Sequence, residues 1–142
     1  MPPIIEGALK IGASELGLGM VKTAVGLYDF ALNGGAVGDI TLRGDTVPSG
    51  AVIVDALIQV NTAPTSAGAA TIALKVEGAA DINAAAAISG APWSTTGAKR
   101  ATLTATSAPI TTTAKRNIVA TVGTAALTGG KFVVLVRYME IV

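Results

Sequence analysis

From Val21 onward, the apolar residues occur in short runs rich in Val, Ile, Thr and Ala, and clusters of Gly, Asn, Pro and Ser separate these runs. This rhythm is typical of β-proteins, because each run is long enough for a strand and each cluster can turn the chain. Apolar residues at helical spacing are scarce. We therefore predict an all-β fold, an antiparallel β-sandwich or jelly-roll-like barrel with at most one short helix.

Six segments have the clearest strand character: 21–30, 39–42, 51–60, 70–77, 117–122 and 131–142. In the third, alternate residues from Val52 to Val60 are expected on one face, and the opposite face, with Asp55 and Gln59, is only half polar. In the fourth, alternation predicts that Ile72, Leu74 and Val76 point inward. We expect these two strands to pair with each other in antiparallel fashion.

The last strand is apolar on both faces. Its first face carries Phe132, Val134, Val136 and Tyr138, and its second face and its end share Val133, Leu135, Met139 and Ile141. Strands of this kind lie in the middle of a structure. Either this strand is covered on both sides within its own domain, or its second face meets a neighbouring subunit.

The best helix candidate is the segment DINAAAAI, residues 81–88. Asp81 can cap the first turn, and the four alanines have high helix propensity. The following segment, 90–98, is predicted to be a loop that carries the single tryptophan, Trp93. The Thr-rich segment 101–113 is expected to be a strand or an extended edge.

Residues 1–20, MPPIIEGALKIGASELGLGM, are too apolar for a solvated tail but too rich in Gly and Pro for a core element. They lack the basic start and compact apolar stretch of a secretory signal, so we expect them to be part of the mature protein. A targeting peptide, a helix packed on its own domain and an arm that lies on another protein remain three interpretations. We predict two regions, an extended N-terminal arm at 1–20 and a β-sandwich or barrel body at 21–142.

Composition excludes several functions. The chain has no Cys and no His, which removes thiolate metal sites, cysteine nucleophiles and the commonest general base. No paired carboxylates or activated serine replace them, so we expect no enzyme activity, no metal and no cofactor. The net charge of +1 provides no field for nucleic acid, and the longest uncharged window, 56–74, is too polar to cross a membrane. With only 13% charged residues and a mean hydropathy of +0.62, the chain is expected to associate with other proteins.

Several short motifs are better explained by structure than by chemistry. Gly17-Leu18-Gly19 lacks the rest of a dinucleotide fingerprint, and Gly130-Lys131 lacks the rest of a phosphate loop. Arg43-Gly44-Asp45 spells the tripeptide that integrins read, but three residues match frequently by chance, and we expect a plain turn. The basic pairs Lys99-Arg100 and Lys115-Arg116 are interpreted as a solvated face, with contact to an acidic partner as the alternative.

The strings GDITLRGDTVPSGAVIVDALIQVNTAPTSAGAATIALKVEGAADI and ATVGTAALTGGKFVVLVRYM resemble small virion structural proteins of tailed bacteriophages, in particular capsid decoration, or cement, proteins. The resemblance covers roughly residues 21–139. It implies a β-sandwich or barrel that oligomerises, often as a homotrimer, on the outer capsid surface of the virion, with an N-terminal extension that reaches across subunits of the major capsid protein.

This resemblance also implies roles for two groups of residues. The apolar side chains of the arm would bind the partner, and they are Ile4, Ile5, Leu9, Ile11, Leu16 and Leu18. Large side chains in the body are candidates for a subunit interface, and they are Trp93, Phe132, Val133, Leu135 and Tyr138. The implied function is non-enzymatic: the protein stabilises a phage capsid by bridging neighbouring subunits.

Three alternatives share parts of this pattern. A tail, tail-tip or head-fibre component would have the same β-rich and charge-poor composition. A cell-surface adhesin could use Arg43-Gly44-Asp45, although an export signal is not apparent. A carbohydrate-binding module would need several exposed aromatic residues, and only 4% of this chain is aromatic.

Overall fold

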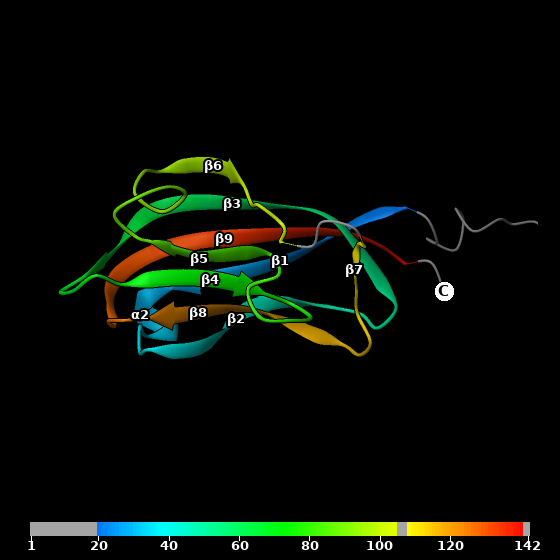
Figure 1. Ribbon diagram of the computed structural model, residues 1–142, viewed down its shortest axis with the longest axis horizontal. Coiled ribbons are helices and arrows are strands. Elements are labelled where there is room, and N and C mark those ends of the chain that lie inside the picture. The colour runs from blue at the N-terminus through cyan, green and yellow to red at the C-terminus, as the bar shows by residue number, and fades with distance from the viewer. Residues whose placement is uncertain (1–19, 105–107, 141–142) are drawn as a thin grey trace, which may run out of the picture.

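The computed structural model describes residues 20–104 and 108–140. Within them, the chain forms nine strands and one short helix (Figure 1). In chain order these elements are β1 (Val21–Asp29), α2 (Phe30–Asn33), β2 (Gly38–Val47), β3 (Ala51–Ser66), β4 (Thr71–Lys75), β5 (Asn83–Ala87), β6 (Gly97–Arg100), β7 (Ile110–Thr111), β8 (Arg116–Gly123) and β9 (Leu127–Glu140). The predicted all-β class with at most one short helix is confirmed.

The strands follow one another laterally in the order β5-β4-β8-β2-β1-β9-β3-β6, and β7 pairs with β3 outside this path. Every pairing is antiparallel. Between β1 and β2 only two residue pairs are in register, Gly26 with Gly44 and Leu27 with Arg43. The sheet therefore folds at this corner into two layers, which we call layer A (β1, β9, β3, β6 and β7) and layer B (β2, β8, β4 and β5).

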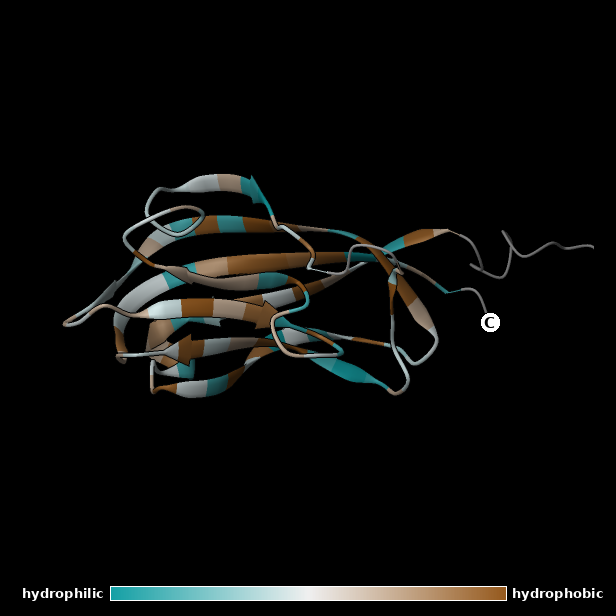
Figure 2. Cartoon of the chain, in the orientation of Figure 1, coloured by the Kyte–Doolittle hydropathy of each residue, from teal (hydrophilic) through white to brown (hydrophobic). Residues whose placement is uncertain are grey.

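The core lies between the inner faces of these two layers. Its largest fully buried side chains are aromatic: the rings of Tyr28 and Trp93 each lie 4.8 Å, between centroids, from the ring of Phe132. Ile72, Leu74 and Val76 point inward from β4 and its end, as the alternation predicted. Figure 2 shows that apolar residues run along β9 and β3, the longest strands of layer A. Other fully buried side chains come from both layers, among them Ile58, Val60, Ile118, Val122 and Val134.

The expected helix at residues 81–88 is wrong. Asn83–Ala87 forms strand β5, which pairs with β4 at the edge of layer B. Asp81 caps a turn instead of a helix, because its carboxylate accepts hydrogen bonds from the backbone N–H groups of Val76, Glu77 and Gly78 at 2.7–3.0 Å. Sheet pairing thus overrides the helix propensity of the alanines.

The expected pairing between residues 51–60 and 70–77 is also wrong. β3 pairs with β9, β6 and β7 in layer A, whereas β4 pairs with β5 and β8 in layer B. The segment between them crosses from one layer to the other, so these strands face each other through the core.

The expected common face from Val52 to Val60 breaks at one position. The register of β3 against β9 shifts between Ile53 and Asp55, so Val54 is 41% exposed while Ile53, Ala56 and Ile58 are all buried. A bulge of this kind moves the residues before it to the opposite face. The period of two therefore predicts the face correctly only from Ala56 to Val60.

The helix of the structure is a single turn at Phe30–Asn33, directly after β1. The side chain of Asp29 caps it by accepting from the N–H of Ala31 at 3.0 Å. Gly34 ends the turn with a φ of 75°, which glycine adopts readily. The predicted N-terminal arm, apart from Met20, lies outside the described residues and stays a prediction.

Candidate interaction surface

The outer face of layer A carries a continuous apolar strip. Strand register places Val25 beside Leu135 and Leu135 beside Leu57, and the next row of this face holds Leu27 and Val133. All five side chains are half-buried, although no other layer of the described structure covers this face. We call these five residues the apolar strip.

Charged pairs lie at two ends of the apolar strip. Arg100 binds Asp55 at 2.9 Å, and Lys131 lies 3.5 Å from Asp29 at the other end. Lys22 binds Glu140 at 2.9 Å, but alternation along β1 places this pair on the same side of the sheet as Ala24 and Tyr28. The hydrogen bond to Glu140 is the main cause that raises the pKa of Lys22 above its usual value. A partner on this face would meet an apolar centre with a charged rim, the usual arrangement of a protein interface.

The outer face of layer B is polar. Its surface includes Asp39, Thr41 and Thr121, and Lys75 forms an ion pair with Asp39 at 2.7 Å. Thr121 donates a hydrogen bond to the same carboxylate at 2.7 Å, and Lys75 and Thr121 together hold the pKa of Asp39 below its usual value. The two outer faces therefore differ in chemistry: layer B presents mainly charged and hydroxyl side chains, and layer A presents the apolar strip.

The structure divides the candidate interface residues between two places. Trp93, Phe132 and Tyr138 are buried in the chain's own core. Val133 and Leu135 are half-buried in the apolar strip. Of this group, only the last two reach an outer face. The candidate arm residues, Ile4, Ile5, Leu9, Ile11, Leu16 and Leu18, lie outside the described residues.

Sequence reasoning missed the partners of Val133 and Leu135 in the apolar strip. Val25, Leu27 and Leu57 come from strands far away in the sequence, and only the register of β1 and β3 against β9 brings them together. The apolar character of the second face of β9 was the one signal in the sequence that pointed to this surface.

Arg43-Gly44-Asp45 lies within β2, at the corner between the two layers, and not in a projecting turn. Gly44 has a φ of 112°, and a Cβ atom there would lie 2.4 Å from the carbonyl oxygen of Val25. The Asp45 carboxylate accepts a hydrogen bond from the N–H of Val25 at 3.0 Å. This tripeptide therefore has a structural role in joining β2 to β1.

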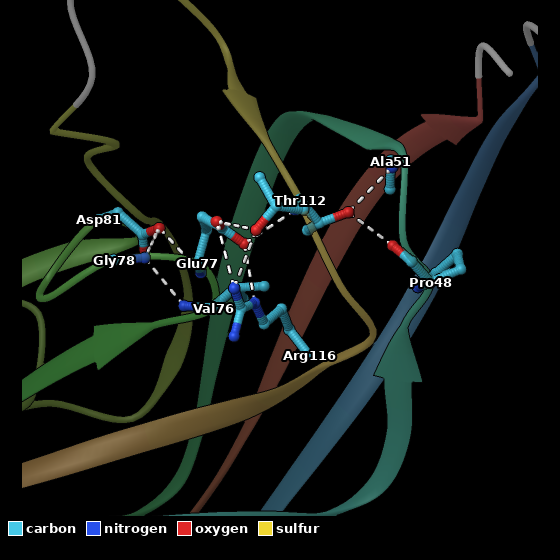
Figure 3. Close-up of polar contacts among 9 residues, drawn as sticks. Pro48, Ala51, Val76, Glu77, Gly78, Asp81, Thr112 and Arg116 are labelled. Carbon is cyan, nitrogen blue, oxygen red and sulfur yellow. Dashed lines mark hydrogen bonds and ion pairs between the residues drawn. The ribbon is translucent and has the colours of Figure 1, made fainter.

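The Thr-rich segment that ends at Thr113 is held to the body by two polar clusters (Figure 3). Arg116 binds both carboxylate oxygens of Glu77, at 2.8 and 3.3 Å, and the Thr113 hydroxyl donates to Glu77 at 2.8 Å. The hydrogen bonds from Arg116, and next those from Thr113, hold the pKa of Glu77 below its usual value. Thr112 donates to the carbonyl of Pro48 at 2.6 Å and accepts from the N–H of Ala51 at 2.9 Å.

Layers A and B do not close into a complete barrel, because β5 and β6 are both end strands. Between them lies a groove of about 460 Å³, lined by Asn83, Ala84, Ala85, Ala86, Ala91, Pro92, Lys99, Arg100, Thr102 and Thr104. Most of this lining is apolar or small. Beside the groove, Trp93 is fully buried, and its indole N–H has no hydrogen-bond partner among the described residues.

Within residues 20–104 and 108–140, there is no helix long and apolar enough to cross a membrane. The same residues contain no group of three acidic side chains placed to hold a metal ion.

Comparison with known proteins gives matches at the level of structure. No protein-family model matches the sequence, and no curated protein is significantly similar to it. Three chains from solved phage capsid structures superpose on most of this chain. A chain from the capsid of Ralstonia phage GP4 has a TM-score of 0.61 and 18% identity, and the match covers 87% of this chain and 86% of that one.

Two further similar chains come from other phages. A chain from the cyanophage Pam1 capsid asymmetric unit has a TM-score of 0.59 and 22% identity, with 86% of each chain covered. A chain from the acidic stable capsid structure of Helicobacter pylori bacteriophage KHP30 has a TM-score of 0.59 and 17% identity, with 88% of this chain and 91% of that chain covered. The described body of this protein therefore has the same fold as chains found in three phage capsid structures.

Proposed function

We propose that this protein is a non-enzymatic structural component of a phage virion that decorates the outer capsid surface and stabilises the shell by bridging neighbouring subunits. The likeness to chains of three phage capsid structures supports a place in the capsid. The sequence resemblance to decoration proteins supports the more specific role.

The observation that carries this proposal is the difference between the two outer faces. Layer B presents an ion pair and threonines, while layer A presents the apolar strip within a charged rim. Covering apolar surface contributes roughly 25 cal/mol per Å², so a partner on layer A stabilises the assembly without any chemistry. We expect this face to contact either a second copy in a homotrimer or the major capsid protein.

The N-terminal arm supplies the second contact in this proposal. Six large apolar side chains in fifteen residues, from Ile4 to Leu18, are enough to bury a substantial area on a partner. When many such contacts are repeated by symmetry over a shell, the first contact of each subunit raises the effective concentration for the next, so the overall binding is stronger than any single contact.

The test uses virions assembled with the full-length protein or with a variant lacking residues 1–20. Quantitative mass spectrometry gives the number of copies per shell, and release of DNA on heating gives particle stability. We expect the shortened protein to fold but to occupy fewer shell sites, and the particles to open at lower temperature. Unchanged occupancy would refute the role of the arm, and labelling of the tail by electron microscopy would refute the capsid location.

A further inference from the structure

The groove between β5 and β6 lies between two strand edges. Among the described residues, β5 pairs only with β4 and β6 pairs only with β3, so each has one side without a strand neighbour there. The N–H of Ala101 binds the carbonyl of Ala56 at 2.9 Å. Because hydrogen-bonded pairs alternate along an antiparallel ladder, Ala98 and Arg100 direct their backbone groups away from β3, and Arg100 lines the groove.

Two hydrogen bonds connect the edges at one end of the groove. The N–H of Thr102 binds the Asn83 side-chain oxygen at 3.0 Å, and the N–H of Thr104 binds the carbonyl of Asp81 at 3.1 Å. The two layers are thus fixed relative to each other beside the groove. An incoming segment would meet a preformed site and would not need to separate the layers.

The lining suits the backbone of another chain. Four alanines give small side chains over which a peptide can approach closely. The basic residues Lys99 and Arg100 lie at the same site. Arg100 is paired with Asp55, whereas Lys99 donates to the carbonyl of Thr95 and forms no ion pair with the described residues. This combination fits an extended peptide that is apolar and carries acidic residues.

The N-terminal segment of the chain has these properties. From Leu9 to Ala13, apolar and other residues alternate with the period of a strand, and Glu6 and Glu15 flank this stretch. The six residues from Ser14 to Gly19, which join this stretch to Met20, would reach about 20 Å in extended form at roughly 3.3 Å each.

We propose that the groove between β5 and β6 binds the N-terminal segment of a neighbouring copy as an added strand centred on Leu9–Ala13. The choice of a neighbouring copy rests on the proposed bridging function. It is supported by the exposure of Met20 and Val21, 51% and 46%, which places the start of the described chain at the surface.

The test uses single cysteines, which are specific here because the natural chain contains none. Full-length Ile11→Cys and a size-tagged, full-length Ala85→Cys are mixed, oxidised and separated without reductant. We expect the mixed dimer to form at least fivefold more than with Thr121→Cys, a matched control on the outer face of layer B. Equal yields with both partners would overturn the proposal.

The double variant Ile11→Cys, Ala85→Cys separates docking within a chain from docking between chains. A cross-link confined to single chains would overturn the choice of a neighbouring copy. An Ala85→Arg variant that keeps its circular dichroism spectrum should self-associate at least tenfold more weakly, and unchanged association would contradict the proposal. These measurements need no shell, so cross-linking without shell binding would reject the proposed function and leave the groove assignment intact.

Discussion

At the scale of single residues, Asp81 holds a turn where the sequence predicted the start of a helix. Its carboxylate binds three consecutive N–H groups at the end of β4, and the residue itself is almost fully buried. An amide in its place would direct an NH₂ group toward N–H donors. We expect Asp81→Asn to lower the free energy of unfolding by about 1–3 kcal/mol in urea denaturation, the usual effect of an unsatisfied buried donor. Asp39→Asn, which changes an exposed ion pair, is the control and should cost less than about 1 kcal/mol.

Glu77 binds the end of the Thr-rich segment, and its ionisation is expected to make the stability of the fold depend on pH at acid pH. Its pKa is lowered in the folded protein, chiefly by the hydrogen bond to Arg116. A carboxyl group with a lowered folded pKa stabilises the fold above its unfolded pKa, and this contribution is lost as the pH falls through the folded pKa. The melting temperature should therefore fall as the pH drops below the ordinary value of 4.5 for glutamate. In Glu77→Gln the fall should be shallower, and identical melting curves from pH 7 to pH 3 would contradict this role.

At the scale of elements, the corner between β1 and β2 depends on Gly44. A methyl group there would lie 2.4 Å from the backbone oxygen of Val25, and the φ of 112° is strained for any other residue. We expect Gly44→Ala to lower the free energy of unfolding by about 3 kcal/mol or more, measured by thermal or urea unfolding. Gly34→Ala is the matched control, because its φ is also positive but its Cβ would meet no atom within 4 Å, so it should cost only about 1 kcal/mol. Equal losses would show that the close approach to Val25 has no effect.

The elements also show what could be predicted from the sequence. Period-two alternation located β4 and the inner face of β3 from Ala56 onward, because these segments have one buried face. Alternation failed before Ala56, since no residue type marks the bulge near Val54. The sequence also failed to predict β5, where four alanines favour a helix but the edge of β4 offers backbone hydrogen-bond partners. The apolar strip depends on long-range register, so from the sequence only its β9 members were apparent.

At the scale of the whole molecule, the two layers are built alike from antiparallel strands, but their outer faces carry different side chains. Both bury one face in a shared core, but the outer face of layer B surrounds Val119 with charged and hydroxyl side chains, whereas that of layer A carries the apolar strip. Leu135 lies at the middle of the apolar strip on layer A, between Val25 and Leu57. If layer A is an interface between copies, a polar side chain at this position should weaken association with little effect on folding.

We therefore expect Leu135→Asn to raise the dissociation constant of the self-associated protein about tenfold or more, equivalent to at least about 1.4 kcal/mol. Val119→Asn is the matched control, because Val119 is also half-buried and lies on the outer face of layer B. Sedimentation velocity over a concentration series measures association, and thermal unfolding checks that both variants fold. If both variants associate as the natural chain does, layer A is not the contact between copies. We would then expect layer A to contact the capsid subunit. The number of Leu135→Asn copies bound per shell would test that contact.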